Sequence, residues 1–172
     1  MAYGGTSVID TNNVPPYAIE VLVYSSGAPN YTAQAIVDQI WASKPAGTQT
    51  YGSLSGTATD SLGNTHTIYY SEPTTIQTYV ALTLTKTTDG TYIGDANVEQ
   101  AIADWAIRNL TVGQSVYASD IIDVVAGLTG VEWVDVSTVA VDDIPVPVSA
   151  NLILTARQLA TIAAADVTVT SL

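Results

Sequence analysis

The amino-acid sequence predicts an α+β fold of two small mixed units, each a mostly antiparallel sheet with helices packed on one face. In each half of the chain, segments with apolar residues at every third or fourth position lie among short alternating or β-branched runs bounded by turn formers. Of the 172 residues, 47% are hydrophobic and 12% charged, enough apolar surface for a core. We place the boundary near Pro73, which gives units at residues 17–73 and 74–172.

The N-terminal segment, residues 1–16, is rich in Gly, Thr, Asn and Pro, which is typical of a linker or a frayed end. Residues 17–24 then alternate, which predicts a strand with Glu20 on one face. The opposite, apolar face consists of Ile19, Val21 and Val23.

A helix should follow a turn at residues 25–30, with Asn30 or Thr32 as its N-cap and its end at Lys44, because the residue before a proline avoids the α region. Its apolar stripe is Ala33, Ile36, Val37, Ile40 and Trp41. Turn formers at 61–64, between β-forming runs, predict a hairpin.

The second unit should open with a strand at residues 76–85 and continue into a long helix capped by Asp95. Asp104 and Arg108 are spaced to pair on the exposed side of this helix. Its apolar stripe is Val98, Ile102, Trp105 and Ala106, and the strand buries Ile76, Thr78, Val80, Leu82 and Leu84 on one face.

A break at residues 110–113 separates this helix from a shorter one, which Ser119 can cap and which Gly127 or Gly130 can end. The shorter helix buries Ile121, Ile122, Val125 and Leu128. The β-branched run 131–141 predicts a long strand.

The last part of the chain begins with alternating prolines at residues 142–147, which indicate an edge or a linker. Thr155 and Gln158 have the spacing of a capping box, which predicts a helix with Leu159 and Ile162 buried. Residues 166–171 predict a final strand.

The charge balance argues against several classes of partner. The net charge is −12 with four basic residues, so phosphate-rich partners such as nucleic acids and anionic membranes are not expected. Cysteine is absent, and no apolar run reaches the ~20 residues of a membrane span. The N-terminus also lacks the basic start and apolar core of a signal peptide.

The sequence offers no set of catalytic groups, so we expect no enzyme activity, no cofactor and no metal. His66 is the only histidine and lies in a hairpin strand without a nearby nucleophile motif, which favours a half-buried strand residue over a catalytic base. Asp142 and Asp143 could bind a metal, but adjacent carboxylates beside prolines are usually solvated.

Trp133 is one residue out of phase with Val134 and Val136, so it faces either a second core or a partner. The proline-rich sequel to its strand indicates a sheet edge, to which another chain could add. The candidate interface is Trp133, Val134, Val136, Val139 and Val141.

Two segments resemble a known family. The sequence RNLTVGQSVYASDIIDVVAGLTGVEWVDV at residues 108–136 resembles the C-terminal part of the baseplate J-like family, the wedge proteins of contractile phage tails. The shared features are the Leu110–Gly113 link, the capped helix and the Gly130-Val131 turn before a strand. AIVDQIWASKPAGTQTYG at residues 35–52 resembles the family's helix followed by Lys-Pro-Ala-Gly, and the resemblance extends roughly over residues 14–172.

The resemblance implies a structural, non-catalytic component of a phage tail baseplate or related contractile injection system, made in the bacterial cytoplasm and located in the virion. It implies contacts with other wedge and hub proteins and between copies in the assembled ring, and an upstream part that this sequence lacks. From the residues alone, a glycan-binding or adhesion module is the alternative, because Thr-rich β structure with scattered Tyr and Trp would serve it.

Overall fold

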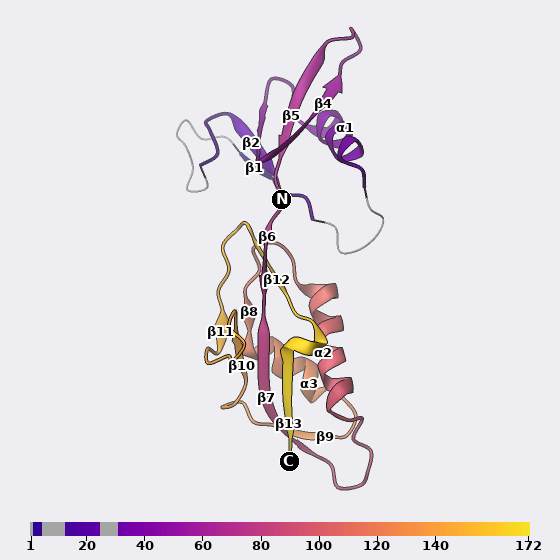
Figure 1. Cartoon of the computed structure of the whole chain (residues 1–172), viewed down its shortest axis with the longest axis vertical. Coiled ribbons are helices and arrows are strands. Elements are labelled where there is room, and N and C mark those ends of the chain that lie inside the picture. The colour runs from indigo at the N-terminus through magenta and orange to yellow at the C-terminus, as the bar shows by residue number, and fades with distance from the viewer. Residues whose placement is uncertain (1, 5–12, 25–30) are drawn as a thin grey trace. The chain divides into compact units, whose positions relative to one another are not determined.

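A computed structural model describes residues 2–4, 13–24 and 31–172 of the chain, which fold into two compact units, Met1–Pro73 (unit 1) and Thr74–Leu172 (unit 2). Each unit combines short strands with helices packed against them, which confirms the predicted α+β class (Figure 1). Among the described strands, antiparallel pairs outnumber parallel ones.

The elements follow one another in a mixed order in both units. Unit 1 contains β1 (Ala2–Gly4), β2 (Ala18–Val21), α1 (Ala33–Ser43), β3 (Gln49–Tyr51), β4 (Leu54–Thr59) and β5 (Thr65–Tyr70). Unit 2 contains β6 (Thr74–Gln77), β7 (Tyr79–Lys86), α2 (Asp95–Asn109), β8 (Val116–Tyr117), α3 (Ala118–Ala126), β9 (Val131–Val134), β10 (Ala140–Asp142), β11 (Asn151–Leu152), β12 (Gln158–Thr161), the 3-10 helix η1 (Ala164–Asp166) and β13 (Val167–Ser171).

Unit 1 consists of a three-stranded sheet, β1-β2-β3, and the antiparallel hairpin β4–β5. Helix α1 packs on the hairpin, where Gly56 lets the helix approach, because an added Cβ would lie 2.7 Å from Val37 Cγ2. Thr32 caps α1 by accepting a hydrogen bond from the backbone N–H of Ala35, and the helix ends at Lys44 in an extended conformation. The predicted helix, its end and the hairpin are therefore confirmed.

The N-terminal segment is not simply a linker or a frayed end. Residues 2–4 form β1, which pairs antiparallel with β2, and Val14 is buried. Strand pairing and burial tie these residues to unit 1. The rest of the predicted linker at positions 1 and 5–12, and the predicted turn and alternative cap at 25–30, lie outside the described residues.

The two faces of β2 differ from the sequence expectation. Its fully buried face carries Glu20, only 2% exposed, whose carboxylate accepts a hydrogen bond of 2.7 Å from the Ser71 hydroxyl. The expected apolar face is half-buried and lines a groove of 780 Å³ beside α1, and its residues are Ile19, Val21 and Val23. The main chain of Ser71, at the end of the hairpin, forms a bridge with Leu22, and the buried face of β2 lies toward this end of the hairpin.

Unit 2 is built on β7, which is paired on both sides. β13 runs parallel to it on one side, while β9 and β10 pair antiparallel with different parts of its other side. Helices α2 and α3 cover one face of this sheet (Figure 1). The core between them comprises Val80, Leu82, Leu84, Val98, Ile102, Ala106, Ile121 and Val125, together with residues from the other strands.

The predicted strand at 76–85 is two strands separated at Thr78. The Thr78 side chain is fully buried and its hydroxyl donates to the carbonyl of Ile76, while its backbone N–H donates to the carbonyl of Thr161. β6 therefore pairs with β12, and β7 pairs with other strands. The single apolar run of the sequence contributes strands to two sheets. The predicted buried face of β7 is confirmed.

The helix caps in unit 2 differ from those predicted. α2 begins at Asp95 after Gly94, which has a φ of 92°, so Asp95 is the first helical residue and not the N-cap. Its carboxylate accepts a 2.7 Å hydrogen bond from the Tyr92 hydroxyl; burial and this bond raise the pKa of Tyr92. Asp104 accepts from Gln100, and not from Arg108 as expected.

The N-cap of α3 is Tyr117, whose backbone N–H donates to Asp120, so Ser119 lies inside the helix instead of capping it. The helix stops at Gly127, which keeps a right-handed conformation. The left-handed glycine is Gly130, with a φ of 80°, in the turn before β9. The buried stripe predicted for α3 is confirmed.

Two predicted elements of unit 2 are wrong in type or length. The long strand 131–141 is split into β9 and β10 by a turn, in which Asp135 accepts hydrogen bonds from the backbone and hydroxyl of Ser137. The capping-box residues do meet, since Gln158 Oε1 accepts from the backbone N–H of Thr155. They close a turn that enters strand β12 and not a helix, because residues 158–161 pair with β6.

Candidate functional site

The predicted interface residues fall into two groups. Val134, Val139 and Val141 are at most 5% exposed and belong to the core of unit 2, so their assignment to an interface is wrong. Trp133 and Val136 are 61% and 58% exposed. Trp133 and Val134 differ in burial because successive side chains of a strand point to opposite faces, and only one face meets the helices. Val136 is exposed because it lies in the turn after β9.

Trp133 stands on β9 opposite Thr85 of β7, and β9 is an edge strand of the described part of the sheet. Val136 lies in the turn that follows, where Ser137 and Thr138 both hydrogen-bond to Asp135. The Ser137 hydroxyl and backbone N–H hold the pKa of Asp135 below its usual value, so the Asp135 carboxyl stays ionised. Trp133 thus lies just before a hydrogen-bonded turn that carries the exposed Val136, a geometry suited to protein contact.

A second exposed apolar feature is the loop 142–149, which contains the residues 142–147 that were predicted as an edge or linker. It closes on itself, because the backbone N–H of Val141 donates to the carbonyl of Ser149 at 2.7 Å. The Ser149 hydroxyl and the Asp143 backbone N–H hold the pKa of Asp142 below its usual value. The side chains of Ile144, Val146 and Val148 are 46–76% exposed.

The Asp142-Asp143 pair therefore has a structural use in this loop. Within residues 2–4, 13–24 and 31–172, no group of three or more His, Asp or Glu side chains is arranged to hold a metal ion.

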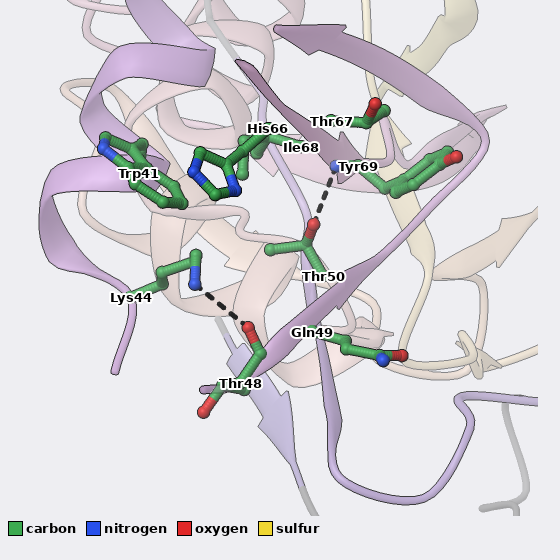
Figure 2. Close-up of a pocket in the computed structure, with 9 residues that line it drawn as sticks. All are labelled: Trp41, Lys44, Thr48, Gln49, Thr50, His66, Thr67, Ile68 and Tyr69. Atoms are coloured by element: carbon green, nitrogen blue, oxygen red, sulfur yellow. Dashed lines mark hydrogen bonds between the residues drawn. The ribbon is translucent and has the colours of Figure 1, made fainter. Parts of the chain in front are cut away.

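Unit 1 contains a small pocket that the sequence did not predict. It has a volume of 280 Å³ between the end of α1, β3 and β5 (Figure 2). Figure 2 shows Trp41, His66 and Lys44 gathered along one wall. The other lining residues are Thr48, Gln49, Thr50, Thr67, Ile68 and Tyr69.

The wall is held by ring and charge contacts. The rings of Trp41 and His66 are stacked, with centroids 4.5 Å apart and an angle of 20°. The Lys44 ammonium lies 4.8 Å from the Trp41 ring and donates to the carbonyl of Thr48 at 3.1 Å. This places a cation over an aromatic ring beside an open cavity.

His66 is oriented by Asp60 at the hairpin turn, with Nε2 and Oδ2 3.0 Å apart. Asp60 also accepts from the backbone N–H groups of Leu62 and Asn64. The hydrogen bond from His66, followed by those from Asn64, holds the pKa of Asp60 well below its usual value. Because the carboxylate is an acceptor, Nε2 of His66 carries a proton, and in the neutral imidazole Nδ1 is left as an acceptor.

We expect the Asp60 network to make the stability of unit 1 depend on acid pH. The folded-state pKa lies below the ordinary 3.8, so its contribution is complete above about pH 4 and is lost as the pH falls through the folded-state value. Asp60→Asn should lower the urea midpoint at pH 6, and the difference from wild type should shrink toward pH 2. A difference that stays constant over this range would contradict the role of the charge.

The same pocket lacks the arrangement of a nucleophilic site. Among the described residues, His66 makes no hydrogen bond to a hydroxyl, which the activation of a Ser or Thr nucleophile requires. The Thr50 hydroxyl instead accepts from the backbone N–H of Tyr69 at 2.9 Å (Figure 2). The groups present are an aromatic wall, a cation, hydroxyls and an amide, which suit binding.

No protein-family model matches the chain, and no curated protein matches it. In the described part of the chain, none of the helices has both the length and the apolar character to cross a membrane.

Proposed function

We propose that the chain is a structural component of a phage-type contractile tail baseplate, which assembles through unit 2 and catalyses no reaction. The proposal comes from the resemblance of residues 35–52 and 108–136 to the baseplate J-like family. The observation that carries the assembly role is the exposed tryptophan, Trp133, on the edge strand β9. Large aromatic side chains at an exposed edge are typical anchors of protein contacts.

Further support comes from the exposed apolar side chains of the loop 142–149, which two prolines and a closing hydrogen bond stiffen. A stiff loop loses little conformational entropy when it binds, so its apolar residues add to affinity efficiently. The expected partners are other wedge and hub proteins and further copies of the chain, and the location is the virion. With 16 acidic and four basic residues, the chain is a poor match for nucleic acid or an anionic membrane.

We expect Trp133→Glu to abolish co-assembly with the other baseplate proteins while changing the free energy of unfolding by less than about 0.5 kcal/mol, because the side chain is 61% exposed. The matched control is Leu62→Glu, which places the same charge at a residue 85% exposed on the hairpin turn of unit 1. Co-sedimentation with purified baseplate proteins measures both variants. Normal co-assembly of Trp133→Glu would refute the proposed contact.

A second candidate is a glycan-binding or adhesion module. The stacked Trp41–His66 wall is the one observation that favours it, because aromatic rings bind the apolar faces of sugars. Broad binding on a glycan array together with failure to co-assemble with any baseplate protein would favour this function over the first.

A further inference from the structure

The pocket of unit 1 has an unusual charge for this protein. The chain has 16 acidic side chains and only four basic ones, yet the pocket is lined by Lys44 and by the only histidine, His66, and by no Asp or Glu. Asp60 contacts the imidazole, but its carboxylate is directed to the hairpin turn and is not among the lining residues. The pocket therefore presents the Lys44 ammonium group and no carboxylate.

The polar groups that point into the pocket have unused capacity. The Lys44 ammonium has three N–H donors, of which the carbonyl of Thr48 takes one. His66 uses Nε2 on Asp60, so Nδ1 of the neutral imidazole remains as an acceptor for a sugar hydroxyl. Thr48, Thr67 and Gln49 are also among the lining residues.

The size and the aromatic wall limit the ligand further. A volume of 280 Å³ is just below the range of ~300–1,000 Å³ that drug-sized ligands occupy, which suits a single six-membered ring. The Trp41–His66 pair gives this ring an apolar wall to lie against, and Lys44 stands at its end (Figure 2). A bare inorganic anion would leave the aromatic wall uncovered.

We propose that this pocket binds a hexose-sized sugar that carries one anionic group, with the anion on Lys44 and the ring against the Trp41–His66 wall. The anionic group is a carboxylate or a phosphate, since both accept charge-assisted hydrogen bonds from an ammonium group. The site does not depend on the baseplate proposal, because it lies entirely within unit 1.

The test is an NMR titration of the whole chain with glucuronate, glucose 6-phosphate, glucose, acetate and inorganic phosphate. The single histidine makes the ring resonances of His66 unambiguous, and the indole N–H of Trp41 reports on the wall. We expect both resonances to move with at least one anionic sugar, and glucose, acetate and phosphate to bind at least about ten-fold more weakly. A response to only one of the two anionic sugars, glucuronate or glucose 6-phosphate, identifies the anionic group as a carboxylate or a phosphate.

Lys44→Met keeps the aliphatic stem and removes the charge, and should weaken the binding of the anionic sugar at least about ten-fold. Lys86→Met, at the end of β7 in unit 2, is the matched control and should leave binding unchanged. Raising the salt concentration should weaken binding to wild type, which tests the charge without a variant.

Three results would overturn the proposal. The first is no shift of His66 or Trp41 with either anionic sugar at about 10 mM. The second is equal binding of glucose, which would remove the role of the charge. The third is equal binding of acetate or inorganic phosphate, which would mean that the aromatic wall contributes nothing.

Discussion

Replacing Gly130 by alanine is expected to lower the free energy of unfolding of unit 2 by about 3–5 kcal/mol. Gly130 has a φ of 80°, a left-handed conformation that costs a residue with a Cβ about 1–2 kcal/mol. An added Cβ would also lie 2.3 Å from the Cα of Tyr92, so the backbone of one of the two segments must move. The carbonyl of Gly130 accepts a hydrogen bond from Thr87, which resists that movement.

Gly90→Ala separates the two causes. Gly90 has a nearly equal φ of 78° in the same unit, but nothing lies within 4 Å of an added Cβ. Gly90→Ala should therefore lower the free energy of unfolding only by the cost of the left-handed conformation, about 1–2 kcal/mol. Urea unfolding followed by the indole NMR signal of Trp105 reports on unit 2. Equal losses for the two variants would mean that the contact with Tyr92 is not restrictive.

Ile102→Ala is expected to lower the free energy of unfolding by about 3–4 kcal/mol, since it removes a fully buried side chain from the face of α2 that packs on the sheet. Ile107→Ala changes the same residue type on the same helix at a position 64% exposed, so it should cost less than about 0.5 kcal/mol. Urea midpoints of the two variants give the comparison. Similar midpoints would contradict the packing of α2.

Elements with a strong local signal could be predicted from the sequence. Such signals predicted most of the helix stripes, the end of α1 before Pro45 and the turn at 61–64, all of which depend on residues close together in the chain. In α1, Val37 and Ile40 are buried as expected, whereas Ala33 is exposed. Helix caps were less certain, because several residues near each start can satisfy the same backbone groups. Gly94 and Tyr117 hold the cap positions that Asp95 and Ser119 were expected to hold.

The rest depends on pairing between distant segments. Residues 158–161 have a local capping pattern, but pairing with β6, more than eighty residues earlier, makes them a strand. The buried Glu20 accepts a hydrogen bond from the Ser71 hydroxyl at the end of the hairpin. No local sequence pattern predicts this contact. In both cases the tertiary contact outweighs the local preference.

The candidate sites divide in the same way. The outward position of Trp133 follows from strand alternation. The phase of its neighbours in the sequence placed it off the main core but left a second core and a partner contact as alternatives. The assignment of Val134, Val139 and Val141 to the interface failed because all three side chains pack into the core of unit 2. The pocket at Trp41 and His66 joins a helix end to a hairpin strand, a meeting that only the fold creates.

The central claim, that this chain is part of a contractile tail baseplate, is tested most directly by electron cryo-microscopy of purified contractile particles from its source. Density that fits units 1 and 2 should be found in the baseplate ring around the central hub, with Trp133 at a contact between chains. Particles whose baseplate density is complete without this chain would contradict the account.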